Sequence, residues 1–324
     1  MSKSKLGVIG VGYLGKFHAY KYSAMNNVDL VGVADTDLDR SRKIADQLKT
    51  RSFGDFRKML PMVDAVSIVV PTKQHFEVAE VCLDNGVDVL IEKPITVTIE
   101  EADALIAKAA LNKRILQVGH IEQFNPAILA MEQYLTSPVF IESQRIHTFN
   151  PRGAEVDVVL DLMIHDIDII TSIVPSPIKT IHAVGIPVVT GNSDIANVRL
   201  IFESGCTANV TVSRISKTNI RKLRIFQPRS FISVDYGKKE IFTIRHLDEK
   251  DENGLPKEET NQFCFAEKDA LEIELKAFVL NVQHRSTPKI GGREGRNALR
   301  IAHQIIDQMK NFIADHQGLL ELGS

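Results

Sequence analysis

Cysteine is scarce in this chain of 324 residues, which contains three: Cys82, Cys206 and Cys264. None stands in a Cys-x-x-Cys pair, and three thiols cannot pair completely. The sequence therefore does not predict a disulfide framework. This cysteine usage is typical of a reducing compartment, so we expect a cytoplasmic protein.

Long apolar runs and an excess of one charge are also missing. No run of about 18 apolar residues occurs, so no transmembrane helix is expected. The start, Met1–Lys5, passes directly into a predicted strand, which leaves no room for a signal peptide. The 39 basic and 41 acidic residues give a net charge of −2. This balance provides no electrostatic reason to expect nucleic acid or a membrane as partner.

One stretch of the chain is nevertheless basic. It contains Arg214, Lys217, Arg221, Lys222, Arg224 and Arg229. Such a stretch has two explanations: the solvent-exposed face of a strand with its loop, or a binding site for an anion. The sequence favours the solvated face.

Apolar strands alternate with amphipathic helices in the first part of the chain. Strands are predicted at 6–10, 30–34, 65–70, 87–92 and 115–118, with helices at 14–24, 38–48, 75–85 and 98–111. Thr98, with Glu101 three residues later, forms a capping box that begins the last of these helices. Strands that are apolar on both faces and alternate with helices indicate a doubly wound parallel sheet. We assign residues 1–120 to an α/β Rossmann domain.

The pattern changes after residue 120. A helix is predicted after Pro126, a strand over 139–147 and an apolar helix over 156–174, and strands dominate from 178 to 265. The polar segment 248–260 is predicted to be a loop, and helices cover 269–284 and 293–316. Residues 121–324 therefore form an α+β domain with a large, mostly antiparallel open sheet. The last helix is also a candidate for packing back on the Rossmann domain.

A glycine-rich loop follows the first predicted strand. Its sequence, Gly10-Val11-Gly12-Tyr13-Leu14-Gly15, is a GxGxxG motif between a strand and a helix. Gly10 permits the tight turn, Gly12 lets a pyrophosphate approach the backbone, and Gly15 lets helix and strand pack closely. The helix N-terminus adds free N–H groups and a positive dipole end. We predict that this loop, including Tyr13 and Leu14, binds a nicotinamide dinucleotide.

Asp35 ends the second predicted strand, 20 residues after Gly15. A carboxylate there accepts hydrogen bonds from the adenosine ribose and repels the extra phosphate of NADP. Thr36 and Asp37, which follow, supply no cation. The alternative is that Asp35 only caps the next helix. The sequence favours NAD over NADP.

Two further strand ends carry polar residues. Thr72 and His75 follow the third strand, and Glu92-Lys93-Pro94 ends the fourth. We predict that Thr72, His75, Glu92 and Lys93 bind the cofactor. In open α/β sheets, ligands lie outside the carboxyl ends of the strands. Pro94 keeps Lys93 out of helical geometry, so the lysine is expected at the rim, facing the nicotinamide and a substrate oxygen. An exposed lysine and a histidine in a first helical turn are the alternatives.

The apolar helix predicted over 156–174 carries one polar stripe. Asp157, Asp161, His165, Asp168 and Ser172 follow helical spacing along one side. Asp161 and His165 are one turn apart, so the carboxylate can orient the imidazole for proton transfer near neutral pH. A purely structural Asp–His pair is the alternative. No cysteine or second histidine joins them, so a metal site is not predicted.

These motifs together resemble the glucose–fructose oxidoreductase/inositol dehydrogenase (Gfo/Idh/MocA) family over almost the whole chain. The matching pieces are Gly10–Gly15, Asp35, Pro71-Thr72 with His75, Glu92-Lys93-Pro94, Phe124-Asn125-Pro126, Asp161 with His165-Asp166, and Arg293-Glu294-Gly295. The resemblance implies hydride transfer between a pyridine nucleotide and a sugar-type secondary alcohol. It implies that Lys93 and His165 bind the reacting hydroxyl and manage its proton, with support from Asp161. It also implies a homodimer or homotetramer that packs through the C-terminal sheet.

The segments 118–126 and 161–168 resemble the branch of the family that oxidises the 3-hydroxyl of UDP-N-acetylglucosamine. Many members carry arginine where this chain has Gln123, which weakens the option of a related sugar-acid substrate. The candidate substrate-binding residues are Lys93, His120, Arg145, Arg152 and His165. Arg145 and Arg152 are candidates to meet a diphosphate, with a surface position as the alternative. Inositol or a free sugar is the alternative substrate, and an NAD-binding sensor without turnover is the alternative function.

Overall fold

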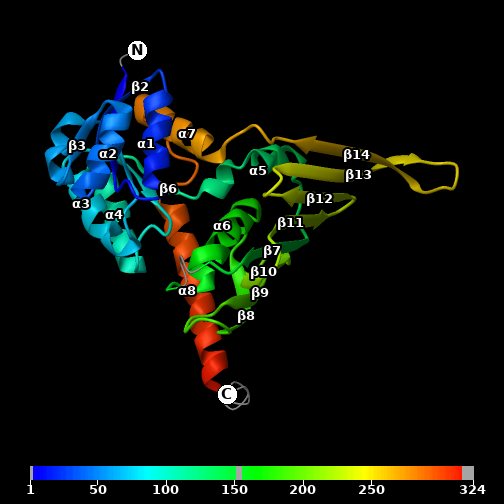
Figure 1. Ribbon diagram of the computed structural model, residues 1–324. Coiled ribbons are helices and arrows are strands. Elements are labelled where there is room, and N and C mark those ends of the chain that lie inside the picture. The colour runs from blue at the N-terminus through cyan, green and yellow to red at the C-terminus, as the bar shows by residue number, and fades with distance from the viewer. Residues whose placement is uncertain (1–2, 151–154, 316–324) are drawn as a thin grey trace. The chain divides into compact units, whose positions relative to one another are not determined.

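The computed structural model describes residues 3–150 and 155–315, and the chain divides into two compact units. The first unit comprises residues 1–121 and 270–299, and the second comprises 122–269 and 300–324 (Figure 1). Residues 270–299, which the sequence analysis grouped with the second domain, thus belong to the first. No helix in the described part of the chain is both long and apolar enough to cross a membrane.

The first unit is built on a six-stranded parallel sheet in the order β3-β2-β1-β4-β5-β6. Its strands are β1 (Ser4–Ile9), β2 (Val28–Ala34), β3 (Arg51–Phe53), β4 (Ala65–Ile68), β5 (Asp88–Glu92) and β6 (Leu116–Gly119). Its helices are α1 (Gly15–Ala24), α2 (Leu38–Leu48), α3 (His75–Asp84) and α4 (Ile99–Leu111), with α7 (Ala270–His284) added from later in the chain. The strand order reverses between β1 and β4, so the predicted Rossmann topology is confirmed.

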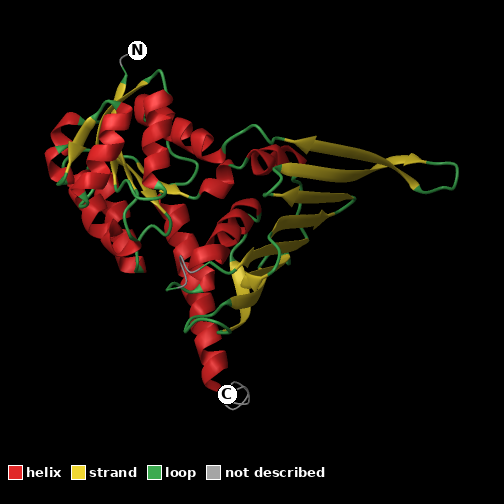
Figure 2. Cartoon of the chain, in the orientation of Figure 1, coloured by secondary structure: helices red, strands yellow, loops and turns green. Residues whose placement is uncertain are grey.

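The helix α7 joins this unit because its apolar face fits the core around α1 and β1. Leu275, Phe278, Val279 and Val282 are buried with residues of α1, α2, β1 and β2. Phe278, for example, is completely buried. A helix at this spacing of apolar residues is stabilised mainly by such tertiary packing. Figure 2 shows α7 as one of the helices around the first sheet.

The second unit is built on an eight-stranded sheet in the order β14-β13-β12-β11-β7-β10-β9-β8. Its strands are β7 (Phe140–Thr148), β8 (Ile178–Ile186), β9 (Ile195–Phe202), β10 (Thr207–Ser216), β11 (Ile220–Gln227), β12 (Ser230–Asp235), β13 (Glu240–Lys250) and β14 (Pro256–Cys264). Its helices are α5 (Pro126–Met131) and α6 (Ile164–Ile173). All neighbouring strands are antiparallel except β7 and β10. The predicted α+β domain with a mostly antiparallel sheet is confirmed.

The helix α8 (Gly292–Asp315) is divided between the units, with the boundary between Leu299 and Arg300. Gly292 lies against Ile106 and Leu116 of the first unit, where an added Cβ would approach within 2.7 Å. Further along, Gln308 Nε2 donates to the carbonyl of Ile181 in β8, at 2.8 Å. The beginning of this last helix therefore packs on the Rossmann core.

Two strands contradict the sequence analysis. The segment 248–260, predicted to be a loop, contains the end of β13 and the first half of β14. Its residues are largely exposed and polar, so they lack the alternation of apolar and polar residues that identifies a half-buried strand. The strand β3 was also missed, because three residues are too few for a periodic pattern.

Candidate active site

The glycine-rich loop has the geometry that a dinucleotide requires. Gly10 has φ of +86°, which favours glycine, and a Cβ at Gly15 would lie 1.8 Å from the Gly10 carbonyl oxygen. A Cβ at Gly12, in contrast, would meet nothing within 4 Å, so this backbone is open. No side chain caps the N-terminus of α1, and Tyr13 and Leu14 are exposed. The loop and the uncapped helix end therefore fit the pyrophosphate of NAD.

A pocket of about 540 Å³ adjoins this loop. It is lined by residues of the loop, α1 and α2: Val11, Gly12, Tyr13, Lys16, Tyr20, Arg40, Lys43, Ile44 and Gln47. Three of these side chains are cationic. A pocket with glycine backbone on one side and cations on the other suits an adenosine with its phosphates.

Asp35 lies where the sequence analysis expected it, directly after β2. One carboxylate oxygen accepts the Val11 N–H at 2.9 Å, and the other accepts the Asp37 N–H at 2.9 Å. Arg40 pairs with Asp35 at 3.2 Å and with Asp37 at 2.9 Å. A cation therefore does lie beside Asp35, although the two residues that follow it are not basic. Arg40 was not predicted, because it reaches Asp35 only through the first turn of α2, which brings it back toward the strand end.

Glu92 ends β5, and its carboxylate lies beside a residue that was not predicted, His18. The Nε2 atom of His18, in α1, lies 3.2 Å from the Glu92 carboxylate, and the Lys93 N–H donates to Glu92 at 3.3 Å. Burial raises the pKa of Glu92, but His18 and Lys93 together lower this pKa by more than burial raises it. The net shift is therefore downward. Glu92 therefore stays ionised and holds the backbone of Lys93. The signal for His18 was its place on the buried face of α1, where a polar side chain needs a partner.

His75 is buried between two backbone carbonyls. Its Nδ1 lies 2.8 Å from the Pro94 oxygen and its Nε2 lies 3.0 Å from the Val70 oxygen. Burial lowers the pKa of His75, and the carbonyls counteract this only partly. The neutral ring has one N–H and donates to one of these carbonyls, and it packs between the loop after β4 and the loop after β5. This arrangement favours a positioning role over direct contact with the cofactor.

Thr72 and His120 complete the set predicted for the first unit. Thr72 begins a short 3₁₀ turn after β4 and is half-buried, and His120 follows β6 and is buried. Because all these strands are parallel, the residues that follow β1, β2, β4, β5 and β6 share one edge of the sheet. The first unit therefore gathers the predicted cofactor residues at its carboxyl edge, together with His120, which was predicted to bind the substrate.

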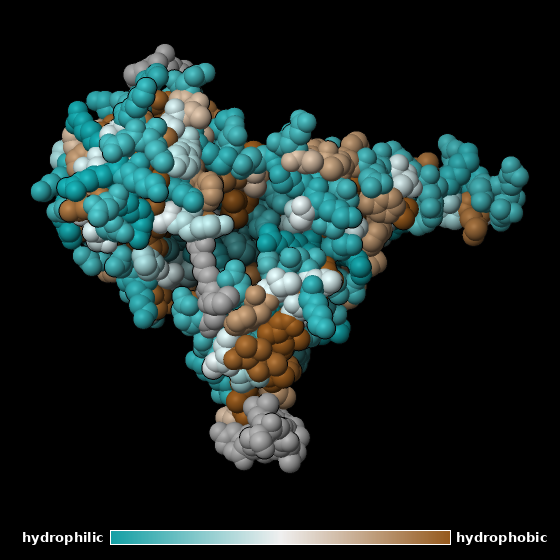
Figure 3. Space-filling model, viewed as in Figure 1, coloured by the Kyte–Doolittle hydropathy of each residue, from teal (hydrophilic) through white to brown (hydrophobic). Residues whose placement is uncertain are grey.

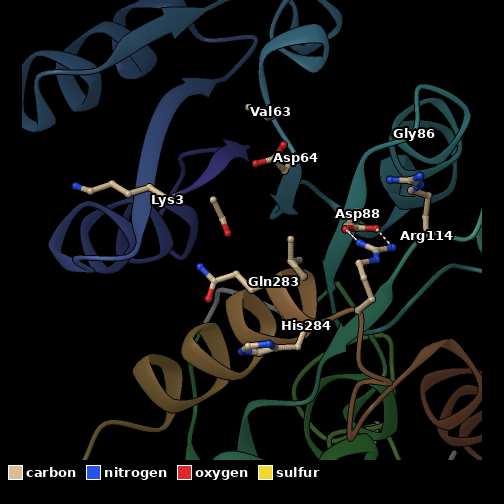
Figure 4. Close-up of a pocket in the computed structure, with 11 residues that line it drawn as sticks. Lys3, Val63, Asp64, Gly86, Asp88, Arg114, Gln283 and His284 are labelled. Carbon is tan, nitrogen blue, oxygen red and sulfur yellow. Dashed lines mark hydrogen bonds and ion pairs between the residues drawn. The ribbon is translucent and has the colours of Figure 1, made fainter. Parts of the chain in front are cut away.

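A second pocket, of about 530 Å³, lies at the opposite, amino edge of the same sheet (Figure 4). Ser4, Asp64 and Asp88 border it at the beginnings of strands, and the end of α7 closes it. Asp88 is buried, accepts the Ile115 N–H at 2.8 Å and is paired with Arg285. This ion pair fastens the end of α7 to β5, so we assign it a structural role.

In the second unit the helix that carries the polar stripe is not α-helical throughout. Residues Val159–Met163 form a π-helical turn that contains Asp161, and α6 begins at Ile164. Such turns are rare and are frequent at functional sites. Asp161 and His165 are both half-buried. Asp161 lies in the π-helical turn and His165 in α6. The periodicity of the apolar residues did not predict this change of helix type.

Three members of the stripe are occupied by local contacts. Asp157 accepts the Val159 N–H at 2.9 Å and so caps the helix. Gln123 Nε2 donates to the Asp168 carboxylate at 2.8 Å and to Ser172 Oγ at 3.1 Å. We assign these contacts a structural role, and Asp161 and His165 stay the pair predicted to carry the chemistry. Gln123 itself is buried and is committed to α6.

Arg145 does not lie at the surface. It is 2% exposed, its Nε donates to Asp166 at 2.7 Å, and its Nη1 donates to Glu122 at 2.8 Å. The ring of Tyr236 lies 5.2 Å from the guanidinium carbon. Although burial disfavours its charge, Asp166 and Glu122 raise the pKa of Arg145 far above its usual value. The guanidinium is thus occupied by the protein, which favours a structural role over diphosphate binding. Arg152, the other predicted arginine, lies outside the described residues.

No group of three or more histidine, cysteine, aspartate or glutamate side chains in residues 3–150 and 155–315 has an arrangement suited to a metal ion. The three cysteines are free thiols, two of them buried. The residues predicted to carry the chemistry lie at the Rossmann edge and at the helical junction.

A nucleotide-binding Rossmann sheet joined to an α+β unit with an aspartate–histidine pair defines a class of dinucleotide-dependent oxidoreductases. The family model described as "oxidoreductase family, NAD-binding Rossmann fold" matches residues 4–120. The model of the GFO/IDH/MocA C-terminal domain matches residues 128–229. The chain belongs to the Gfo/Idh/MocA family of NAD-binding oxidoreductases.

Known relatives resemble the chain along its whole length. It is 37% identical over 314 residues to the UDP-N-acetylglucosamine 3-dehydrogenase of Acidithiobacillus ferrooxidans, a match that covers 97% of this chain and 99% of that enzyme. A solved structure of that enzyme has a TM-score of 0.89 at 35% identity, and covers 97% of this chain and 100% of its own. The myo-inositol 2-dehydrogenase of Thermotoga maritima is 25% identical over 320 residues, which cover 92% of this chain and 94% of the relative.

Proposed function

We propose that the protein is an NAD-dependent dehydrogenase that oxidises the 3-hydroxyl of UDP-N-acetylglucosamine. The observation that carries this proposal is the full-length similarity to the Acidithiobacillus ferrooxidans enzyme. The commitment of Gln123 to Asp168 supports a neutral sugar, because no arginine stands at that position to hold a sugar acid.

The proposed chemistry separates a hydride from a proton. NAD, when bound, accepts the hydride that leaves the carbinol carbon. We assign the hydroxyl proton to the imidazole of His165, which Asp161 orients. We assign to the ammonium of Lys93 the stabilisation of negative charge that develops on the same oxygen. Glu92, fixed by His18, holds the backbone of Lys93.

We further propose a homo-oligomer that packs through the second sheet. The face opposite to α6 carries an aromatic cluster in which the ring centroids of Phe226 and Phe140 are 5.7 Å apart and those of Phe226 and Phe231 are 5.1 Å apart. Phe226 is 37% exposed. Exposed aromatic side chains are enriched at interfaces between subunits. Figure 3 shows additional apolar surface over the part of the second unit around β8. Val184 of this strand is exposed. The three free thiols support the cytoplasm as the compartment.

A substrate panel tests the function. The purified chain is incubated with NAD and with UDP-N-acetylglucosamine, UDP-glucose, myo-inositol or N-acetylglucosamine, and NADH formation is followed by absorbance. We expect turnover with UDP-N-acetylglucosamine at the highest kcat/KM. A higher kcat/KM with myo-inositol would contradict the proposed substrate but would agree with the proposed dehydrogenase reaction. Tight NAD binding without turnover of any compound would indicate a sensor.

A further inference from the structure

The basic stretch of the second unit is mostly neutralised by carboxylates. Four of its side chains form ion pairs: Arg214 with Asp194, Lys222 with Asp235, Arg224 with Glu142, and Arg229 with Asp248. Lys217 and Arg221 form no ion pair with the residues that the structure describes. Lys217 lies in the exposed turn between β10 and β11, and Arg221 is the second residue of β11.

Arg221 lies on the sheet face that α6 covers. It is the register partner of Arg145 in the neighbouring strand β7, and His147 follows Arg145 by two residues on the same face. On this face, Asp166 of α6 accepts hydrogen bonds from Arg145 Nε at 2.7 Å and from Ser143 Oγ at 2.7 Å. Arg221 therefore shares a face with the helix that contains His165.

Arg221 and His147 together offer hydrogen-bond donors that the described residues do not use. Arg221 Nε donates to His147 Nε2 at 3.2 Å, so Nε2 is an acceptor and the imidazole proton is on Nδ1. The two terminal nitrogens of Arg221 make no hydrogen bond to the described residues. A ligand that meets these groups must supply several acceptor oxygens. The planar fork of arginine matches a phosphate in this way.

The electrostatics of the neighbourhood also favour an anion. Glu122 and Asp166 are both engaged by Arg145. Partial burial and the charge of Arg145 lower the pKa of Arg221 by more than these carboxylates raise it. Burial, Arg221 and Arg145 likewise lower the pKa of His147 to about 4. Burial is the largest cause of both shifts, and the repulsion between neighbouring cations adds to it, which a bound anion would relieve.

We propose that Arg221, oriented by His147, binds phosphate oxygens of the diphosphate in the nucleotide-sugar substrate. This inference rests on the proposed function, since it takes the substrate to be a nucleoside diphosphate sugar. It assigns the diphosphate to the face on which α6 lies. It also assigns diphosphate binding to Arg221 in place of Arg145, whose guanidinium is engaged by Asp166 and Glu122.

Equilibrium titration with UDP as the probe tests this site without turnover. The variants are Arg221→Met and, as matched control, Arg224→Met, which removes an arginine from the opposite face of the same strand. Loss of charge-assisted hydrogen bonds is expected to weaken UDP binding about 10- to 100-fold in Arg221→Met. Arg224→Met should bind UDP like the wild type, and uridine, which has no phosphate, should bind all three proteins equally. Equal UDP affinity of Arg221→Met and wild type, or no UDP binding by the wild type, would overturn the inference.

Kinetics separate this inference from the function on which it rests. If both hold, Arg221→Met raises KM for UDP-N-acetylglucosamine about 10- to 100-fold with kcat within about threefold of wild type. Oxidation of the nucleotide sugar with unchanged KM would overturn the diphosphate site alone. UDP binding that depends on Arg221, without oxidation of any nucleotide sugar, would overturn the proposed function alone. Arg221→Gln, which keeps a polar side chain of similar length, replaces the methionine variant if its melting temperature shows loss of folding.

Discussion

Lys93 follows β5, and its backbone N–H is held by the ionised, partly buried carboxylate of Glu92. Replacement by methionine keeps the length and removes the charge. We expect turnover to fall about 10²- to 10⁴-fold, because the developing alkoxide loses its cation. The affinity for the cofactor, measured as NADH binding by fluorescence titration, should change far less. Near-normal turnover would contradict the assignment of Lys93.

His165 is the second residue on which the proposed chemistry depends. His165→Ala is expected to lower kcat about 10²- to 10⁴-fold and to remove the acidic limb of the pH–rate profile, because the proton acceptor is gone. Asp161→Asn should show a smaller loss, since it perturbs only the orientation of the ring. The measurement is initial rate against pH for each variant. An unaltered profile in His165→Ala would remove its role as proton acceptor.

Cofactor preference depends on Asp35 and on Arg40, which lies beside it. In Asp35→Ser the repulsive carboxylate is removed while the guanidinium stays, so the site gains a cation for the 2′-phosphate of NADP. We expect the ratio of NADPH to NADH affinity to rise at least about tenfold, which corresponds to one charge-assisted hydrogen bond. The double variant Asp35→Ser/Arg40→Met is the control and should lose this gain. An unchanged ratio in the single variant would mean that Asp35 does not select the cofactor.

Residue roles were predictable from sequence where the backbone motif alone sets the geometry. The glycine loop and Asp35 needed only a strand, a turn and a helix, and the structure has all three. Arg40, His18 and Arg221 needed contacts across elements, which no local pattern contains. Arg145 was predicted as a candidate to meet a diphosphate, because the sequence does not show that Glu122 and Asp166 pair with it.

At the scale of elements, the strand end that carries His147 should be sensitive to acid. The pKa of His147 is about 4 in the folded chain, because burial, Arg221 and Arg145 outweigh Glu122 and Asp166. The unfolded chain takes up this proton near pH 6.5. Below that pH the unfolded state binds more protons, so stability falls as the pH drops from about 6.5 to about 4. His147→Gln should show a smaller fall, measured by urea unfolding at both ends of this range.

The matched control for this experiment is His182→Gln, which changes an exposed histidine in β8 of the same sheet. It should lose as much stability in acid as the wild type. An equal acid sensitivity of His147→Gln and wild type would show that other groups dominate. Arg145 and its two carboxylates remain in both variants, so their contribution cancels from the comparison.

Element boundaries were predictable where apolar periodicity was strong. The helix α2 was predicted with its observed bounds, and the capping box of Thr98 and Glu101 is present. The strand β14 was not, because it is held by pairing with β13 and not by burial of its own side chains. The π-helical turn around Asp161 was hidden as well, since one additional residue per turn does not disturb an almost wholly apolar pattern.

At the scale of the whole molecule, the aromatic cluster on the second sheet should decide the oligomeric state. Phe226→Glu places a charge where a subunit interface is proposed, and desolvation of that charge disfavours association. We expect a fall to the monomer mass, measured by light scattering. Leu111→Glu, which changes an exposed leucine of the first unit, should leave the mass unchanged. A wild-type mass in Phe226→Glu would contradict an interface through this face.

The first unit is made of two segments that are far apart in the sequence, and this affects how the unit folds during synthesis. Residues 1–121 leave the ribosome first, but α7 is made only after the whole second sheet. Until then the apolar surface around Tyr22 and Leu6 lacks Phe278 and Val279. Nascent chains with such uncovered surface are prone to aggregate and are substrates for chaperones. A ribosome-bound fragment that ends before residue 270 should therefore be protease-sensitive in its Rossmann part, and a fragment extended through residue 299 should not.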